Sequence, residues 1–90
     1  MLEATVEVRN QLGLHARAAA QLVRLANEFK SKIIVSREDT HSFANAKSIL
    51  SILTLAASMG TKLLITAEGD DAETALASIK SLFLSGFGEV

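Results

Sequence analysis

Polar and apolar residues alternate along the first positions of the chain. The apolar members of this segment are Leu2, Ala4, Val6 and Val8, and the polar members are Glu3, Thr5, Glu7 and Arg9. A period of two is typical of a strand that buries one face, so residues 2–9 are predicted to form a strand. Short β-branched or alternating segments predict further strands at 32–37, 40–44 and 61–68. Glu38 and Asp39 separate the middle two strands, which indicates a hairpin.

Three other segments repeat apolar residues every three or four positions, which predicts helices with one buried stripe. The expected stripes are Ala19, Leu22, Val23, Ala26 and Phe29 within residues 16–29; Ile49, Ile52, Leu53 and Ala56 within residues 45–58; and Ala72, Ala75, Leu76, Ile79, Leu82 and Phe83 in the last helix. Asp70 is predicted to cap the last helix, with Glu73 completing a capping box. Gly86 and Gly88 break the pattern, so residues 87–90 are predicted to be a tail.

The order β-α-β-β-α-β-α predicts an α+β fold. We expect an open-faced two-layer sandwich, with a four-stranded antiparallel sheet and three helices on one of its faces. The other face is expected to be solvated, and its polar residues are Glu3, Thr5, Glu7, Lys62 and Thr66. With 90 residues, 49% of them hydrophobic, the chain is expected to be a single domain, 1–90, with little room for a deep cleft.

Charge and composition exclude several kinds of function. The net charge is −1 and the four aromatic residues are all Phe, so we expect no binding to nucleic acid. No apolar run is long enough to span a bilayer and the start of the chain lacks a basic signal-peptide region, so we expect no membrane association. The absence of Cys suits a cytoplasmic location. The two His residues, His15 and His41, are far apart and no carboxylate cluster accompanies them, so no metal is expected; His41 is predicted to have no role.

The most informative residues are His15 and Arg17, at the start of the first predicted helix. The first turn of a helix has unpaired N–H groups and the positive end of a dipole, and so binds anions. A neutral imidazole offers a nucleophilic nitrogen near neutral pH. We therefore expect His15 to carry a phosphoryl group and the forked guanidinium of Arg17 to bind its oxygens. The alternative is a histidine that only caps the helix and an arginine that is only solvated.

Residues 13–17, Gly-Leu-His-Ala-Arg, resemble the active-site motif of the HPr family, the histidine-containing phosphocarriers of the bacterial phosphoenolpyruvate-dependent phosphotransferase system. Residues 45–50, Asn-Ala-Lys-Ser-Ile-Leu, resemble that family's second signature, a helix with a regulatory serine. The spacing between the motifs is close to the family pattern. The resemblance implies that Enzyme I phosphorylates His15 on Nδ1 and that an enzyme IIA-type protein then takes the group. It implies a carrier without a cofactor, expected to be a monomer.

The chain departs from the family pattern at Ala18, where sugar-transport members usually carry proline. Proline and alanine both suit the start of a helix, so we expect the site to be preserved, with one additional N–H near the phosphate. The alanine run 18–20 and the ending 87–89, Phe-Gly-Glu, resemble the nitrogen-related branch of the family.

Ser48 is predicted to lie in the first turn of the second helix, where the dipole favours a phosphate. In Gram-positive members of the family, a dedicated kinase, HPr kinase/phosphorylase, modifies this serine and blocks exchange with the upstream donor. The resemblance implies the same regulatory role for Ser48. The alternative is a serine kept only to cap the helix.

Leu50 lies off the predicted apolar stripe of its helix, which indicates an exposed apolar residue. We expect it to join neighbouring residues in a docking patch for partners with an acidic rim around an apolar centre. The docking patch consists of Ala16, Ala20, Arg24, Lys47, Ile49, Leu50 and Leu53. The alternative for Arg24 is a side chain that only faces solvent. In the family one surface serves both donor and acceptor, which implies sequential exchange.

Three functions follow from these residues. The first is a phosphocarrier between Enzyme I and an enzyme IIA-type acceptor. The second is a regulatory phospho-switch in a nitrogen-related phosphotransferase chain, without sugar transport. The third, an enzyme that uses His15 as an acid or base, is disfavoured because no second catalytic group is evident in the sequence.

Overall fold

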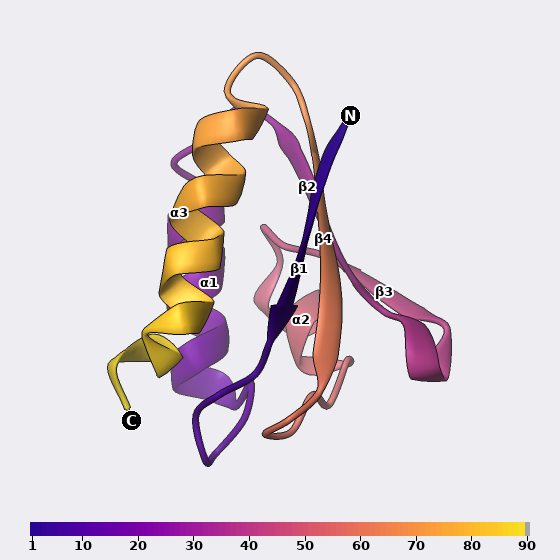
Figure 1. The fold of residues 1–90 in the computed structure, drawn as a ribbon, viewed down its shortest axis with the longest axis vertical. Coiled ribbons are helices and arrows are strands. Elements are labelled where there is room, and N and C mark those ends of the chain that lie inside the picture. The colour runs from indigo at the N-terminus through magenta and orange to yellow at the C-terminus, as the bar shows by residue number, and fades with distance from the viewer. Residues whose placement is uncertain (90) are drawn as a thin grey trace.

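A computed structural model describes residues 1–89 of the chain as an antiparallel sheet covered on one side by helices (Figure 1). The strands are β1 (Leu2–Glu7), β2 (Lys32–Arg37), β3 (Ser42–Asn45) and β4 (Lys62–Glu68), in the sheet order β1-β4-β2-β3. The helices are α1 (Ala16–Ala26), α2 (Ile49–Leu53) and α3 (Ala72–Leu84), with short 3₁₀ turns at Glu38–Thr40 and Gly86–Gly88. The predicted α+β sandwich and its element order are confirmed. No helix in this part of the chain is long and apolar enough to cross a membrane.

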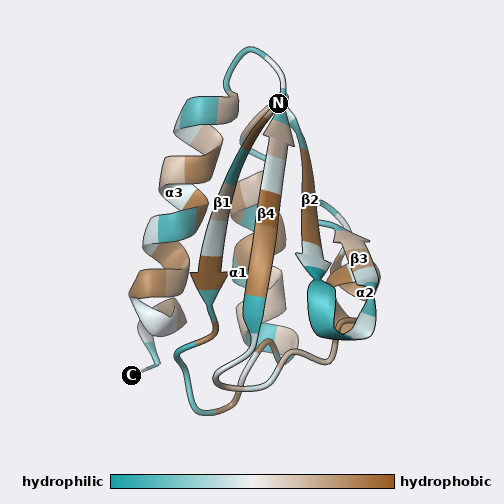
Figure 2. Ribbon diagram, turned by 45° about the vertical axis from the view of Figure 1, so that its right-hand side comes forward, coloured by the Kyte–Doolittle hydropathy of each residue, from teal (hydrophilic) through white to brown (hydrophobic). Residues whose placement is uncertain are grey.

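The core lies between the sheet and the helices, and the period-two pattern places the strand residues in it. Val35 of β2 is paired with Ile65 of β4, and both are almost fully buried. Within residues 1–89, no helix covers the opposite face of the sheet (Figure 2). This face carries the alternate residues and is open to solvent, as predicted, and Glu3 and Lys62, for example, are exposed.

Helix α1 begins at the predicted residue but ends three residues early. After Ala26 the chain continues in tighter turns, in which the N–H of Glu28 donates to Leu25 and that of Phe29 donates to Ala26. The Asn27 side chain donates to the Val23 carbonyl at 2.8 Å, which satisfies a carbonyl of the last helical turn. Phe29 still packs against the core, so the predicted stripe holds although the helix is shorter.

The second predicted helix, residues 45–58, is wrong in length, because α2 contains only five residues. At its start Asn45 belongs to β3, and the N–H of Ala46 extends the pairing with β2 by donating to Ile33. At its end Ala56 adopts a positive φ of 49° and is exposed, not buried as predicted. The next carbonyl, that of Ala57, accepts a hydrogen bond from the N–H of Leu14 at 2.8 Å. Backbone groups at both ends of the predicted helix thus form hydrogen bonds with other segments and not within a helix.

The capping box predicted for α3 is also wrong. Asp71 is the residue before the helix, and it makes no side-chain capping bond to it. Its carboxylate instead accepts hydrogen bonds from the backbone N–H groups of Lys30 and Ser31, at 2.8 and 2.9 Å, and from the Ser31 hydroxyl. These bonds, led by that of Ser31, hold the pKa of Asp71 below its usual range. The start of α3 is therefore fastened to the segment that precedes β2.

The predicted tail is instead an ordered turn packed on the core. Gly86, Phe87 and Gly88 all have positive φ, which wraps the chain back towards the start of α1. Phe87 is 3% exposed, and its ring meets that of Phe83 edge to face with the centroids 4.9 Å apart. This packing explains why the turn has a defined structure, since burial of the aromatic ring offsets the backbone strain of Phe87. Val90, which was predicted to end the tail, lies outside the described residues.

Candidate functional site

His15 is the residue that caps the start of α1. Its backbone is extended, with φ −76° and ψ −178°, and its carbonyl accepts the first helical hydrogen bond from the N–H of Ala19. The ring turns back so that Nδ1 accepts a hydrogen bond from the N–H of Arg17 at 3.3 Å. Nδ1 must therefore carry a lone pair, which lies at the positive end of the helix dipole.

The other ring nitrogen contacts a carboxylate from the opposite end of the chain. Nε2 of His15 lies 2.6 Å from Oε2 of Glu89, and since Nδ1 accepts a hydrogen bond, Nε2 carries the hydrogen and donates it. Oε1 of Glu89 accepts a second bond, at 2.9 Å, from the side-chain amide of Asn10. The pKa of Glu89 is held below its ordinary value mainly by Asn10, and also by His15 and the charge of Arg17, although desolvation acts the other way.

Asn10 and Gly13 determine the path of the loop that leads to His15. Asn10 is fully buried, and its amide donates to the carbonyl of Gly13 at 2.7 Å as well as to Glu89. Gly13 has a φ of +71°, and a Cβ there would lie 2.6 Å from the carbonyl oxygen of Ala57. Only glycine fits this close approach. The loop is thereby pressed against the segment after α2, and His15 is held at a defined position.

Arg17 is exposed beside this ring, where it can reach a bound anion. A shallow hollow of about 370 Å³ next to the site is lined by Gln11, Leu12, Arg17, Gly88 and Glu89. The N–H groups of Ala16, Arg17 and Ala18 precede the first helical hydrogen bond, which Ala19 donates. An anion at Nδ1 would thus meet backbone donors and a guanidinium together, as anion sites at helix starts do. The Ala18 side chain itself is fully buried.

The structure places Ser48 one position earlier than predicted, at the N-cap of α2 instead of within its first turn. Its Oγ accepts a hydrogen bond from the N–H of Ser51 at 3.4 Å, so it does cap the helix. The side chain remains half-buried. Capping is therefore its visible structural role, and any regulatory role is an additional one.

The residues predicted to form the docking patch lie on or just before the two helices α1 and α2, which contact one another. Leu50 is 74% exposed and Ile49 is 38% exposed, whereas Leu53 packs partly against the core. On α1, Ala16 and Arg24 are exposed and Ala20 is half-buried. The ammonium of Lys47 donates to the carbonyl of Phe29 at 2.6 Å, so this residue is fastened to the segment that follows α1.

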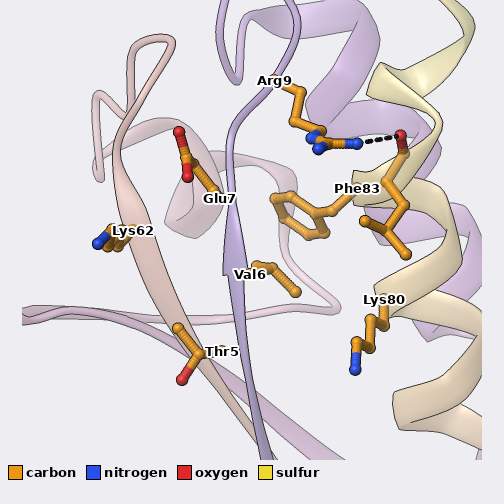
Figure 3. A pocket seen from close by; sticks show the side chains of 8 residues that line it. Thr5, Val6, Glu7, Arg9, Lys62, Lys80 and Phe83 are labelled. Carbon is orange, nitrogen blue, oxygen red and sulfur yellow. Dashed lines mark hydrogen bonds between the residues drawn. The ribbon is translucent and has the colours of Figure 1, made fainter.

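A separate pocket of about 280 Å³ lies between β1 and α3 (Figure 3). It is lined by Thr5, Val6, Glu7, Arg9, Lys62, Lys80, Phe83 and Leu84. Arg9 donates to the carbonyl of Leu84 at its rim, at 3.4 Å. Neither His15 nor Arg17 lines this pocket, so it is not part of the site at the start of α1.

Asn10 and Glu89 are the site residues that sequence reasoning missed. The two glycines at 86 and 88 signalled a turn before Glu89, but no local pattern placed its carboxylate beside His15. Asn10 gave no such signal, since a polar residue after a strand is ordinarily a surface loop residue.

Comparison with known proteins identifies the family of the chain. The family model for the "PTS HPr component phosphorylation site" matches residues 2–85. The phosphocarrier protein HPr of Xylella fastidiosa (strain Temecula1) is 42% identical, over 99% of this chain and 98% of that protein. The crystal structure of HPr-C-His from Thermoanaerobacter tengcongensis, 43% identical, superimposes with a TM-score of 0.94 over 100% of this chain and 99% of that one. An HPr dimer from the same organism is 44% identical with a TM-score of 0.78, over 99% of this chain and 100% of that one. The chain belongs to the HPr family, the phosphocarrier proteins of the phosphotransferase system.

Proposed function

We propose that the protein accepts a phosphoryl group from Enzyme I on Nδ1 of His15 and passes it to an enzyme IIA-type acceptor. The observation that carries this proposal is the hydrogen bond from the N–H of Arg17 to Nδ1, because it marks that nitrogen as unprotonated and aimed at the helix start. A phosphoryl group bound there would take up the same N–H groups and the Arg17 guanidinium. Family membership supplies the phosphocarrier activity.

The protein acts in this proposal as a carrier and not as a turnover enzyme, because His15 is itself the group that becomes modified. We place it in the cytoplasm, where Enzyme I is charged from phosphoenolpyruvate. We propose a monomer as the working form, because the docking patch must be open to each partner in turn. Sedimentation at the working concentration tests this, and a dimer like that of the Thermoanaerobacter relative would contradict it.

The docking patch is proposed to receive both partners. Leu50 and Ile49 supply its exposed apolar centre, and Arg17 and Arg24 supply positive charge along α1. A partner with an apolar centre and acidic rim complements this arrangement. Phosphorylation of Ser48 by an HPr kinase/phosphorylase would put a dianion beside that centre and weaken docking to Enzyme I.

The second candidate function is a regulatory phospho-switch in a nitrogen-related phosphotransferase chain. Ala18 in place of proline and the ending 87–89 favour it. Both candidates use the same phosphorylation of His15 and differ only in the acceptor.

The test is mass spectrometry after mixing the protein with Enzyme I and phosphoenolpyruvate. We expect an adduct of about 80 Da, a phosphoryl group, which is labile in acid and stable in base. His15→Ala should abolish the adduct, and an adduct that persists in this variant would contradict the proposal. Repeating the experiment with sugar-type and nitrogen-type enzyme IIA proteins distinguishes the two candidates by which acceptor removes the group.

A further inference from the structure

We propose that Glu89 is a positioning residue for phosphoryl transfer: it holds the hydrogen of His15 on Nε2, and it neutralises the positive charge that the ring acquires when Nδ1 is phosphorylated. This inference rests on the proposed function of His15. It assigns a role in the reaction to a side chain near the end of the chain, 74 residues away from the histidine in sequence.

The contact between Glu89 and His15 is short and partly shielded from water. The distance between Nε2 and Oε2 is 2.6 Å, and the two side chains are 27% and 11% exposed, respectively. A charge-assisted hydrogen bond in such a setting is stronger than one in open solvent. The Arg17 N–H occupies Nδ1 from the other side, so both neighbours of the ring select the same tautomer.

Glu89 is itself held in place by buried groups. Asn10, which is fully buried, donates to Oε1 of Glu89 and so leaves Oε2 directed at the histidine. The burial of Phe87, two residues earlier, anchors the turn that carries the carboxylate. The lowered pKa of Glu89 agrees with an ionised carboxylate at neutral pH.

The transfer balances without any movement of a proton. The lone pair of Nδ1 forms a bond to phosphorus as the bond between phosphorus and the donor breaks, and the electron pair of that bond leaves with the donor. The ring then bears a hydrogen on Nε2, a phosphoryl group on Nδ1 and one positive charge, which Glu89 neutralises. In the onward step a lone pair of the acceptor's nucleophile forms a bond to phosphorus as the bond between phosphorus and Nδ1 breaks. The electron pair of the broken bond returns to Nδ1, and the ring is again neutral with its hydrogen on Nε2. The opposite tautomer would first have to lose a proton from Nδ1.

Two charged side chains line the hollow beside the ring, and they act on different parts of the phosphorylated residue. Arg17 is available to the phosphoryl oxygens, while Glu89 is engaged with Nε2. The attraction between Arg17 and the phosphoryl group opposes the repulsion that the carboxylate exerts on it. Removal of Glu89 should therefore change how the phosphorylated ring responds to pH, which a residue with only a structural role would not do.

The first test is NMR spectroscopy of the unphosphorylated protein, which requires no partner. We expect the ¹⁵N signals of the His15 ring to show the hydrogen on Nε2, as a downfield proton that exchanges slowly with water. Glu89→Gln should shift that proton upfield and make its exchange fast. Glu3→Gln, which removes the same charge from the open face of the sheet, should leave it unchanged. A hydrogen on Nδ1 in the wild type, or an unaltered signal in Glu89→Gln, would overturn the inference.

The second test follows the phosphorylated protein. In Glu89→Gln we expect phosphorylation by Enzyme I to slow by about tenfold, comparable to the loss of a carboxylate that orients a metal-bound histidine. The pH at which hydrolysis of the phosphohistidine falls to half of its acid rate should move about one unit lower, because the carboxylate no longer stabilises the protonated ring. Glu3→Gln should match the wild type in both measurements.

The two proposals fail in different ways. If the wild type accepts no phosphoryl group, the proposed function is wrong, and the NMR test still reports on the contact between Glu89 and His15. If the wild type is phosphorylated but Glu89→Gln keeps its rate and its pH profile, the role of Glu89 is wrong and the proposed function stands.

Discussion

At the scale of single residues, the candidate site contains buried groups that hold the structure and an exposed group that is proposed to bind the phosphate. Asn10 and Gly13 are buried and shape the loop before α1, so their substitution would disturb the fold. Arg17 is exposed. This division means that the contribution of Arg17 to transfer can be measured without loss of stability.

We predict that Arg17→Ala slows phosphorylation of His15 and leaves the domain folded. An exposed side chain of this kind usually changes the free energy of unfolding by less than about 0.5 kcal/mol. Rapid-quench transfer kinetics and thermal melting measure the two effects separately. Arg24→Ala, on the same helix but farther from its start, is the control and should slow transfer less. A large fall in melting temperature for Arg17→Ala would show a structural role instead.

At the scale of secondary-structure elements, the short helix α2 and the start of α3 depend on side chains that precede them. Ser48 caps α2 through its hydroxyl, and Asp71 fastens α3 to the segment before β2. Both residues are polar groups at a helix start, but only the first bonds its own helix. The two sites therefore respond differently to changes in charge.

We predict that Ser48→Asp weakens docking to Enzyme I and leaves the fold intact. Asp is as good an N-cap as Ser, and its charge suits the helix dipole, so stability should change by no more than about 1 kcal/mol. The same charge lies next to Ile49 and Leu50 and would be repelled by an acidic partner rim. The measurement is the transfer rate as a function of Enzyme I concentration. Ser48→Ala should lose some stability but keep its affinity, whereas unchanged affinity in Ser48→Asp would count against the docking patch.

We predict that part of the acid sensitivity of the fold arises from Asp71. Its folded pKa lies below the usual value, so its contribution to stability is complete above that usual value and is lost as the pH falls towards the folded pKa. Urea unfolding at neutral pH and at about pH 3 should show a smaller loss of stability in Asp71→Asn than in the wild type. Asp70→Asn, at the exposed neighbouring residue, is the control. An equal loss in all three proteins would refute this role.

At the scale of the whole molecule, the C-terminal turn connects α3 to the start of α1. Phe87 packs on Phe83 of α3, and Glu89 reaches His15 at the start of α1. The packing of one aromatic ring thereby governs the position of a carboxylate in the site. With the role proposed for Glu89, we expect stability and phosphoryl transfer to be coupled at this turn, unlike at Arg17.

We predict that Phe87→Ala lowers the free energy of unfolding by about 3 kcal/mol, as truncation of a buried phenylalanine does. The released turn should also slow phosphorylation of His15, since Glu89 loses its anchor. Phe43→Ala is the matched control, because Phe43 is 73% exposed on β3 and its loss should cost less than about 0.5 kcal/mol. Denaturant unfolding and transfer kinetics measure both effects. Equal stability of the two variants would mean that the turn is not packed.

The amino-acid sequence alone was enough to predict the order and type of the elements and to single out His15 as the centre of the candidate site. Alternation and β-branched runs predicted each strand to within two residues, because the preference for a strand is largely a local property of the backbone. The start of α1, and His15 as the residue before it, followed from the change to a helical period. The two motifs around His15 and Ser48 indicated the family in the same local way.

The ends of the second helix and the position of Glu89 depend on contacts between segments that are distant in the sequence. The helix predicted over residues 45–58 is shorter at both ends, because Ala46 is hydrogen-bonded to Ile33 and Ala57 is hydrogen-bonded to Leu14. The periodicity within the segment contains no information about these distant partners. The same holds for Glu89, whose place beside His15 depends on the burial of Phe87 and the amide of Asn10. Local sequence reports local preference, whereas these hydrogen bonds exist only after the chain has packed.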